Sequence, residues 1–151
     1  MNPDVVVIHV GLQDLWDGSS EERVFEDYQK LVEAILKHSA TKLCMSLIIP
    51  VLGYPILNKR ITSVNEKLST YITEMRKRND LKQRLFTCSN DILAGYIERS
   101  VGSQGKYLRL TGRGEKKLWL RLKDNITRSL MLPLQSTNHD RDHKRNNIRN
   151  D

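Results

Sequence analysis

Residues 106–128 hold eight lysines and arginines, and this is the part of the chain whose side chains could do chemistry. An arginine guanidinium stays protonated near neutral pH, so it cannot act as a general base, but it pairs with phosphate oxygens. We therefore predict a phosphate-binding surface, with Arg109 and Arg113 as the first contacts. The full set of candidates is Lys106, Arg109, Arg113, Lys116, Lys117 and Lys123, together with Arg76 and Arg78 upstream.

The charge of the chain is unevenly distributed. Residues 1–75 hold 7 basic and 10 acidic residues, whereas residues 76–151 hold 18 and 8. The net charge is therefore −3 in the first half and +10 in the second, which favours a polyanionic partner such as nucleic acid. A solvated basic surface that only aids solubility is the alternative.

Three apolar, β-branched runs predict the strands that position these side chains. They are residues 4–10 (DVVVIHV), 42–50 (KLCMSLIIP) and 84–88 (RLFTC). The runs are apolar on both faces, which is typical of a parallel sheet, and the first is predicted to be a central strand.

Helices of crossover length separate these strands. Residues 21–39 have helical apolar spacing behind a capping-box pattern formed by Ser19 and Glu22, and residues 56–79 predict a long helix that ends at Arg76 and Arg78. Strands alternating with helices imply right-handed βαβ units. The predicted fold is α/β, with three layers (α/β/α) around a parallel sheet.

The elements around the basic segment are shorter. A short helix is expected from residue 91 to about 99, followed by a glycine-containing loop at residues 102–105. Residues 106–110 predict either a last short strand or an extended lead-in, and Thr111 is the N-cap of a final helix. The inner face of that helix is expected to carry Leu118, Trp119, Leu122 and Ile126.

Residues 1–132 are predicted to form one domain, and residues 133–151 a disordered polar tail, since the tail has almost no apolar residues. His139 and His143 lie four apart in that tail, but a metal site needs more fixed ligands, so neither a metal nor a cofactor is predicted.

Both cysteines, Cys44 and Cys88, lie in apolar runs, which favours buried free thiols in a reducing compartment. No stretch approaches the roughly 18 apolar residues of a membrane span. The expected location is the cytoplasm.

Two blocks carry a resemblance to a known family. The strand DVVVIHVG followed by LQD, and the strand–turn–helix LRLTGRGEKKLWLRL, resemble two blocks of the SGNH (GDSL-type) hydrolases in order and spacing. The resemblance implies an SGNH hydrolase-like fold. It also implies that the first strands, including the one with the nucleophilic serine, are missing here, so the sheet edge at residues 5–10 would be exposed.

The family's catalytic positions hold other residues in this chain. By the resemblance, Gln13 stands where the family has an oxyanion-stabilising Asn, Lys106 where it has the Asp, and Arg109 where it has the His. Arginine cannot act as the base, and a charged lysine cannot accept a hydrogen bond from an imidazole. The resemblance therefore implies a pseudoenzyme with no catalytic residue.

A degenerate SGNH fold with basic residues in these positions resembles the OSK domain of the Oskar family of insect germ-plasm proteins. The match rests on the VVVIHVGLQDLWDG, SLIIPVLGYPILNKRITSVNEKL and LRLTGRGEKKLWLRL segments. It implies an inactive hydrolase-like domain that binds RNA, mRNA included, through surface lysines and arginines in cytoplasmic germ-plasm granules. The sequence has no RRM, KH or zinc-knuckle signature, so we expect the RNA to be bound as single strands or structured loops. Germ-plasm proteins are then further expected partners.

Two other functions stay open: a fragment of an active esterase whose nucleophile lies outside this chain, and a scaffold whose basic face binds an acidic protein.

Among the remaining candidates, His9 is interpreted as a core histidine, His38 as a helix cap and Asp14 as a turn residue. Tyr107 and Tyr54 could stack on bases or pack in the core.

Overall fold

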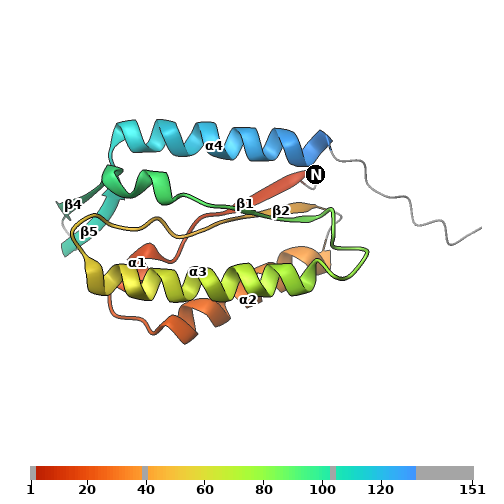
Figure 1. The fold of residues 1–151 in the computed structure, drawn as a ribbon, viewed down its shortest axis with the longest axis horizontal. Coiled ribbons are helices and arrows are strands. Elements are labelled where there is room, and N and C mark those ends of the chain that lie inside the picture. Colours follow the sequence, from red (N-terminus) through yellow and green to blue (C-terminus); the bar gives the residue numbers. More distant parts are fainter. Residues whose placement is uncertain (1–2, 39–40, 103–104, 132–151) are drawn as a thin grey trace, which may run out of the picture.

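The three apolar runs form a parallel sheet. A computed structural model of the chain describes residues 3–38, 41–102 and 105–131. Strands β1 (Val5–Ile8), β2 (Lys42–Ser46) and β3 (Leu85–Cys88) lie in that order, and both pairs are parallel (Figure 1). The parallel sheet predicted from the sequence is confirmed, but β1 is not central. It forms one edge of the described sheet, and β2, buried at every residue, is the central strand.

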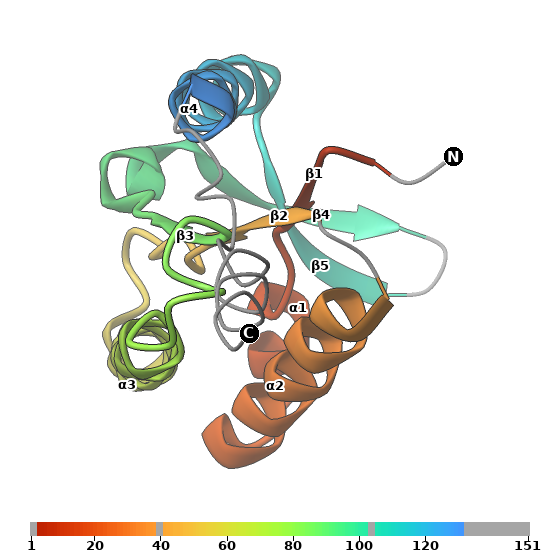
Figure 2. The same ribbon diagram turned by 90° about the vertical axis from the view of Figure 1, so that its right-hand side faces the viewer.

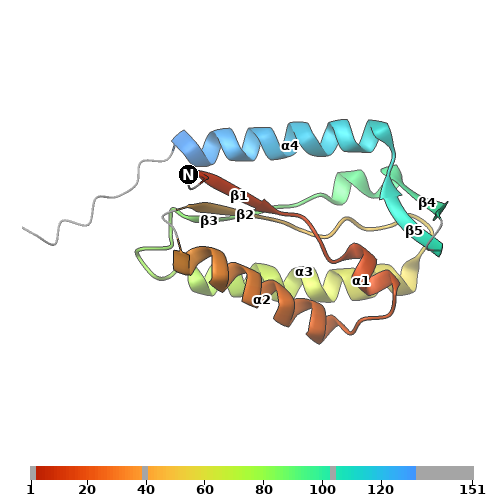
Figure 3. The same ribbon diagram turned by 180° about the vertical axis from the view of Figure 1, so that it is seen from behind.

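Helices cover both faces of this sheet. α2 (Glu21–His38) and α3 (Pro55–Met75) pack on one face, and α4 (Gly112–Met131) packs on the other (Figure 2). The short helix α1 (Leu12–Trp16) follows β1 and lies beside α2 and α3 (Figure 3). The molecule is therefore a mixed α/β fold in three layers.

The main core lies between the sheet and the pair α2 and α3. Tyr28 and Val32 of α2, Leu68 of α3, and Leu43 and Met45 of β2 are at most 1% exposed. Complete burial of one such apolar side chain contributes about 1.5–3 kcal/mol. A smaller cluster of Ile49, Leu93 and Leu118 lies beneath α4.

β2 ends at Ser46, whereas the sequence predicted a strand to residue 50. Beyond Ser46, the backbone at Ile48 and Val51 bonds to asparagine side chains of α3 instead of to a neighbouring strand. Asn65 of α3 accepts from the Ile48 amide and donates to the Ile48 carbonyl, both at 2.9 Å. Asn58 makes the same pair with Val51, at 2.7 and 2.8 Å. The extended segment after β2 is thus tied to α3 through its backbone.

The segment after β3 differs most from the prediction. Only a 3-10 helix, η1 (Asp91–Tyr96), forms where a helix to residue 99 was predicted. β4 (Ile97–Gly102) follows and pairs with β5 (Gly105–Leu110) as an antiparallel hairpin, a separate two-stranded sheet. Residues 106–110 are therefore a strand, but they do not join the parallel sheet. Cross-strand pairing explains why residues 97–99 leave the helix.

Three helix details also differ from the prediction. Ser20, not Ser19, caps α2, because its hydroxyl accepts from the Arg23 amide at 3.2 Å. α3 ends at Met75, so Arg76 and Arg78 follow the helix instead of closing it. Thr111 caps α4 as predicted, accepting from the Gly114 amide at 3.2 Å.

Gly114 lets α4 approach η1. A Cβ at this position would lie 2.6 Å from Tyr96 Cβ and 2.9 Å from Leu110 Cδ2. The backbone of the first α4 turn therefore packs directly on the hairpin and on the end of η1. This contact fixes the start of α4 against β5.

Both cysteines are buried and free, as predicted. Burial raises the pKa of Cys44 to about 12 and also raises the pKa of Cys88. Within residues 3–38, 41–102 and 105–131, no helix is long and apolar enough to cross a membrane. The predicted tail at residues 133–151, with His139 and His143, lies outside the described residues.

Candidate nucleic-acid interface

The basic side chains of this segment are distributed over β5 and along α4. β5 runs directly into α4 through Thr111, whose amide donates to the Tyr96 carbonyl at 2.8 Å. Arg109 is the basic residue of β5 next along the chain to Arg113, whereas Lys106 lies at the start of β5 and projects from the opposite face of the strand. All six candidates of this segment are exposed: Lys106, Arg109, Arg113, Lys116, Lys117 and Lys123.

The charge of this segment contrasts with the opposite layer. Residues 97–131 hold nine basic and three acidic residues, whereas α2 on the other face of the sheet holds three basic and five acidic ones. Of this segment, α4, with six basic and two acidic residues, lies on the face of the sheet opposite α2 (Figure 2), and β5 contacts both α4 and α1. A polyanion is attracted to the face of α4 and the hairpin.

Two of the six candidates already have partners within the domain. Arg109 Nη2 lies 2.8 Å from Glu98 Oε1, directly across the hairpin, and both side chains are about half exposed. Lys117 Nζ lies 4.6 Å from the centroid of the Tyr96 ring, and its hydrogen bond lowers the pKa of the Tyr96 hydroxyl. Among the described residues, Lys106, Lys116 and Lys123 form no salt bridge, so their charges are available to a ligand.

Arg76 and Arg78 are not brought to this surface. They follow α3 at the end of the molecule opposite the hairpin (Figure 1). Arg76 donates to the Lys82 carbonyl at 3.3 Å, and Arg78 lies 3.3 Å from Asp80. These two arginines therefore close a local turn.

A cavity of about 450 Å³ lies where β1 and the hairpin meet, and its polar lining includes His9, Gln13, Asp14, Arg109 and Glu115. Gln13 and Arg109 thus line the same cavity. Lys106 is not among the residues that line the cavity.

Gln13 is used as a structural link. Its Oε1 accepts from the Leu108 amide at 3.2 Å, and its Nε2 donates to Asp17 at 2.9 Å. The amide therefore joins α1 to β5, with its oxygen and one of its two N–H groups engaged within the domain.

His9 is held by a buried polar chain. Its Nδ1 lies 2.9 Å from Ser46 Oγ, which accepts from Asn90 Nδ2 at 2.8 Å. Burial lowers the pKa of His9, partly offset by a hydrogen bond with the Ser46 backbone, so the ring is neutral near pH 7. Ser46 is 1% exposed and does not line the cavity, so this Ser–His pair cannot reach a substrate.

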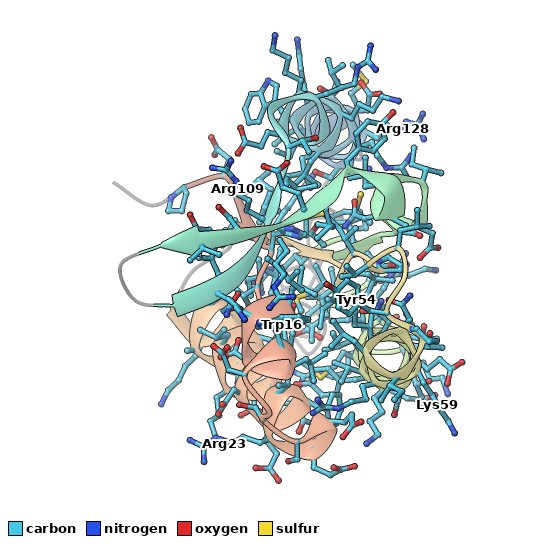
Figure 4. The ribbon with its side chains drawn as sticks, turned by 90° about the vertical axis from the view of Figure 1, so that its left-hand side faces the viewer. Trp16, Arg23, Tyr54, Lys59, Arg109 and Arg128 are labelled. Atoms are coloured by element: carbon cyan, nitrogen blue, oxygen red, sulfur yellow. The ribbon has the colours of Figure 1, made fainter. Side chains whose placement is uncertain are left out.

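The structure contradicts the expected position of one aromatic residue and places the two tyrosines that the sequence left open. Trp119 is 62% exposed, so its predicted inner position on α4 is wrong. Tyr54 packs edge-on against Trp16, with ring centroids 5.3 Å apart (Figure 4). Tyr107, 36% exposed, covers Gly102, where an added Cβ would lie 2.9 Å from its Cε1. Tyr54 therefore packs inside, and Trp119 is the most exposed of these rings.

Comparison with models of protein families, with curated proteins and with solved structures finds no match for this chain. Its function therefore has to be argued from its own residues.

Proposed function

We propose that this chain is an RNA-binding, catalytically inactive domain of the SGNH hydrolase-like class, similar to the OSK domain, and that RNA binds on the face formed by α4 and the hairpin. The observation that carries the proposal is the charge of residues 97–131, which hold nine basic and three acidic residues and include α4, on the face of the sheet opposite the acidic α2. A cytoplasmic ribonucleoprotein granule is the setting that the OSK resemblance suggests.

The proposed contacts are electrostatic. Lys106, Arg113, Lys116 and Lys123 contact phosphates, because they are exposed and form no salt bridge within the described residues. Each contact releases counterions from the RNA, so the logarithm of the affinity falls with the logarithm of the salt concentration. Four contacts to a single strand predict a slope of about −3.

The cavity residues support the absence of hydrolysis. Arg109 is held by Glu98, Gln13 by Leu108 and Asp17, and His9 by the buried Ser46. None of these groups supplies an accessible nucleophile with a base beside it. Hydrolysis of a small acyl ester by this chain would contradict the proposal.

The test is RNA binding by fluorescence anisotropy over a range of salt concentrations. The variant Arg113→Glu/Lys116→Glu reverses two proposed contacts, so we expect an affinity loss on the order of tenfold or more and a salt slope shallower by about 1.4. The matched control is Lys37→Glu/Lys59→Glu, which reverses two exposed charges on α2 and α3; Lys59 lies far from α4 (Figure 4). Equal losses for both variants would refute the assignment of the face.

The control also separates RNA binding from an acidic protein partner. If an acidic protein were the ligand, RNA would bind with the same weak affinity to the wild type and to both variants. Circular dichroism of each variant verifies that the fold is retained.

A further inference from the structure

The most conspicuous uncharged feature of the basic face is an exposed tryptophan. The chain has two tryptophans: Trp16 packs against Tyr54, and Trp119 is 62% exposed on α4. An exposed tryptophan ring offers a ligand a large, rigid apolar area, and its neighbours on the helix decide which ligand it suits.

Trp119 lies in line with two lysines of the proposed interface. Lys116 is three residues before it and Lys123 four residues after it, so all three side chains project from neighbouring positions on the helix surface. The two lysines are about 10 Å apart along the helix axis, with the ring between them. An aromatic ring between two exposed ammonium groups is an arrangement that binds bases and phosphates together.

The contacts of α4 show on which side of the helix Lys116, Trp119 and Lys123 lie. Arg121 donates to the Ser89 carbonyl at 2.6 Å and Asn125 to Cys88 Sγ at 3.2 Å, so their flank faces the end of β3. Trp119 is turned from Arg121 by about 200° around the helix. Its flank therefore points away from β3, toward the side of the sheet where β1 forms the edge.

The distribution of apolar residues on α4 argues against a membrane or a helical protein as the ligand. Leu120, Leu130 and Met131 are also exposed on α4, at 58, 51 and 77%. Leu120 lies about 100° around the helix from Trp119, with Lys116 and Lys123 between the two side chains. Leu130 and Met131 lie about 16 Å or more along the helix axis from Trp119, beyond Lys123. Charged side chains therefore interrupt the exposed apolar surface, whereas membrane insertion or helix packing requires an unbroken apolar stripe.

We propose that Trp119 stacks on an unpaired base of single-stranded RNA while Lys116 and Lys123 hold the flanking phosphates. This inference rests on the proposed RNA-binding function and specifies its ligand as single-stranded. A base in a duplex is covered on both sides by its neighbours, so it offers no free face to the ring.

The two tryptophans allow a direct test by fluorescence. In the variant Trp16→Phe all tryptophan emission comes from Trp119, and in Trp119→Phe it all comes from Trp16. We expect a single-stranded RNA oligonucleotide to quench the emission of the first variant and to leave that of the second unchanged. If Trp16→Phe does not fold, the difference between the wild type and Trp119→Phe gives the same quantity.

Affinity supplies the second readout. Trp119→Ala should weaken binding of single-stranded RNA by ~5- to 150-fold, which is the range for loss of one stacked base. Leu120→Ala, the neighbouring exposed residue, is the matched control and should leave the affinity unchanged. Binding of a duplex of the same sequence should be equally weak for the wild type and Trp119→Ala.

The outcomes separate the two proposals. If the wild type binds RNA but Trp119 is not quenched and Trp119→Ala keeps full affinity, stacking is refuted and the RNA-binding function stands. If the wild type does not bind RNA, both are refuted. A blue shift of Trp119 emission on anionic vesicles that exceeds the response to RNA would overturn stacking in favour of a membrane surface.

Discussion

Replacing Gly114 by alanine tests the contact that sets α4 against the hairpin. An added methyl group would lie 2.6 Å from Tyr96 Cβ, 2.9 Å from Leu110 Cδ2 and 3.2 Å from the Tyr96 carbonyl oxygen. Two of these atoms belong to the Tyr96 backbone or to its first side-chain carbon, so they cannot move away without shifting the chain. The substitution should therefore displace the first turn of α4.

The expected magnitude follows from two opposing effects. Alanine is favoured over glycine inside a helix by about 1 kcal/mol. Overpacking against atoms that cannot move costs about 1–3 kcal/mol, and the short distances place this site in the upper part of that range. We expect a net loss of about 1–2 kcal/mol in the free energy of unfolding, and a decrease in Tm of roughly 2–8 °C.

Gly112 provides the matched control, because a Cβ built there has no neighbour within 4 Å. Gly112→Ala should be neutral or stabilise the protein by up to about 1 kcal/mol. Urea unfolding followed by circular dichroism measures both variants. A Gly114→Ala variant as stable as Gly112→Ala would refute the close approach of α4 to Tyr96.

Two further predictions concern polar groups beside the sheet. Burial holds the pKa of His9 below its usual 6.5, so the unfolded chain binds more protons below that pH, and stability should fall as the pH drops through 6.5. His9→Asn should flatten this part of the stability–pH profile, and an unchanged slope would contradict the burial. Asn65→Ala removes both partners of the Ile48 backbone and should cost about 2–3 kcal/mol in urea unfolding, whereas the exposed Asn79→Ala should stay within about 0.5 kcal/mol.

The parallel sheet could be predicted because its strands are continuous apolar runs. Residues 42–46 are buried on both faces, and the nearly continuous apolar run to which they belong predicts this burial. The hairpin could not be predicted in the same way. Residues 97–102 (IERSVG) alternate weakly, and they become a strand because β5 lies opposite. Strand formation that depends on side-chain packing against a neighbouring strand leaves little trace in the composition of the strand itself.

Because β4 was not predicted from the sequence, the ion pair that it forms with β5 was not predicted either. Glu98 lies opposite Arg109 only when the two strands are paired, so the ion pair that occupies Arg109 was not foreseen. The position of Trp119 was missed for a different reason. Its spacing to Leu122 and Ile126 fits an apolar helix face, but α4 packs over β2, β3 and η1, so the flank toward β1 stays uncovered.

The position of β1 at the edge of the sheet has a consequence for amide hydrogen exchange. The Lys42 amide donates to the Asp4 carbonyl, so in the alternating ladder Val6 and Ile8 bond to β2 while the amides of Val5 and Val7 point outward. Among the described residues no strand pairs with that outer side. Slow and fast exchange should therefore alternate along a single strand, and an extended segment that docked on β1 would slow exchange at Val5 and Val7 alone.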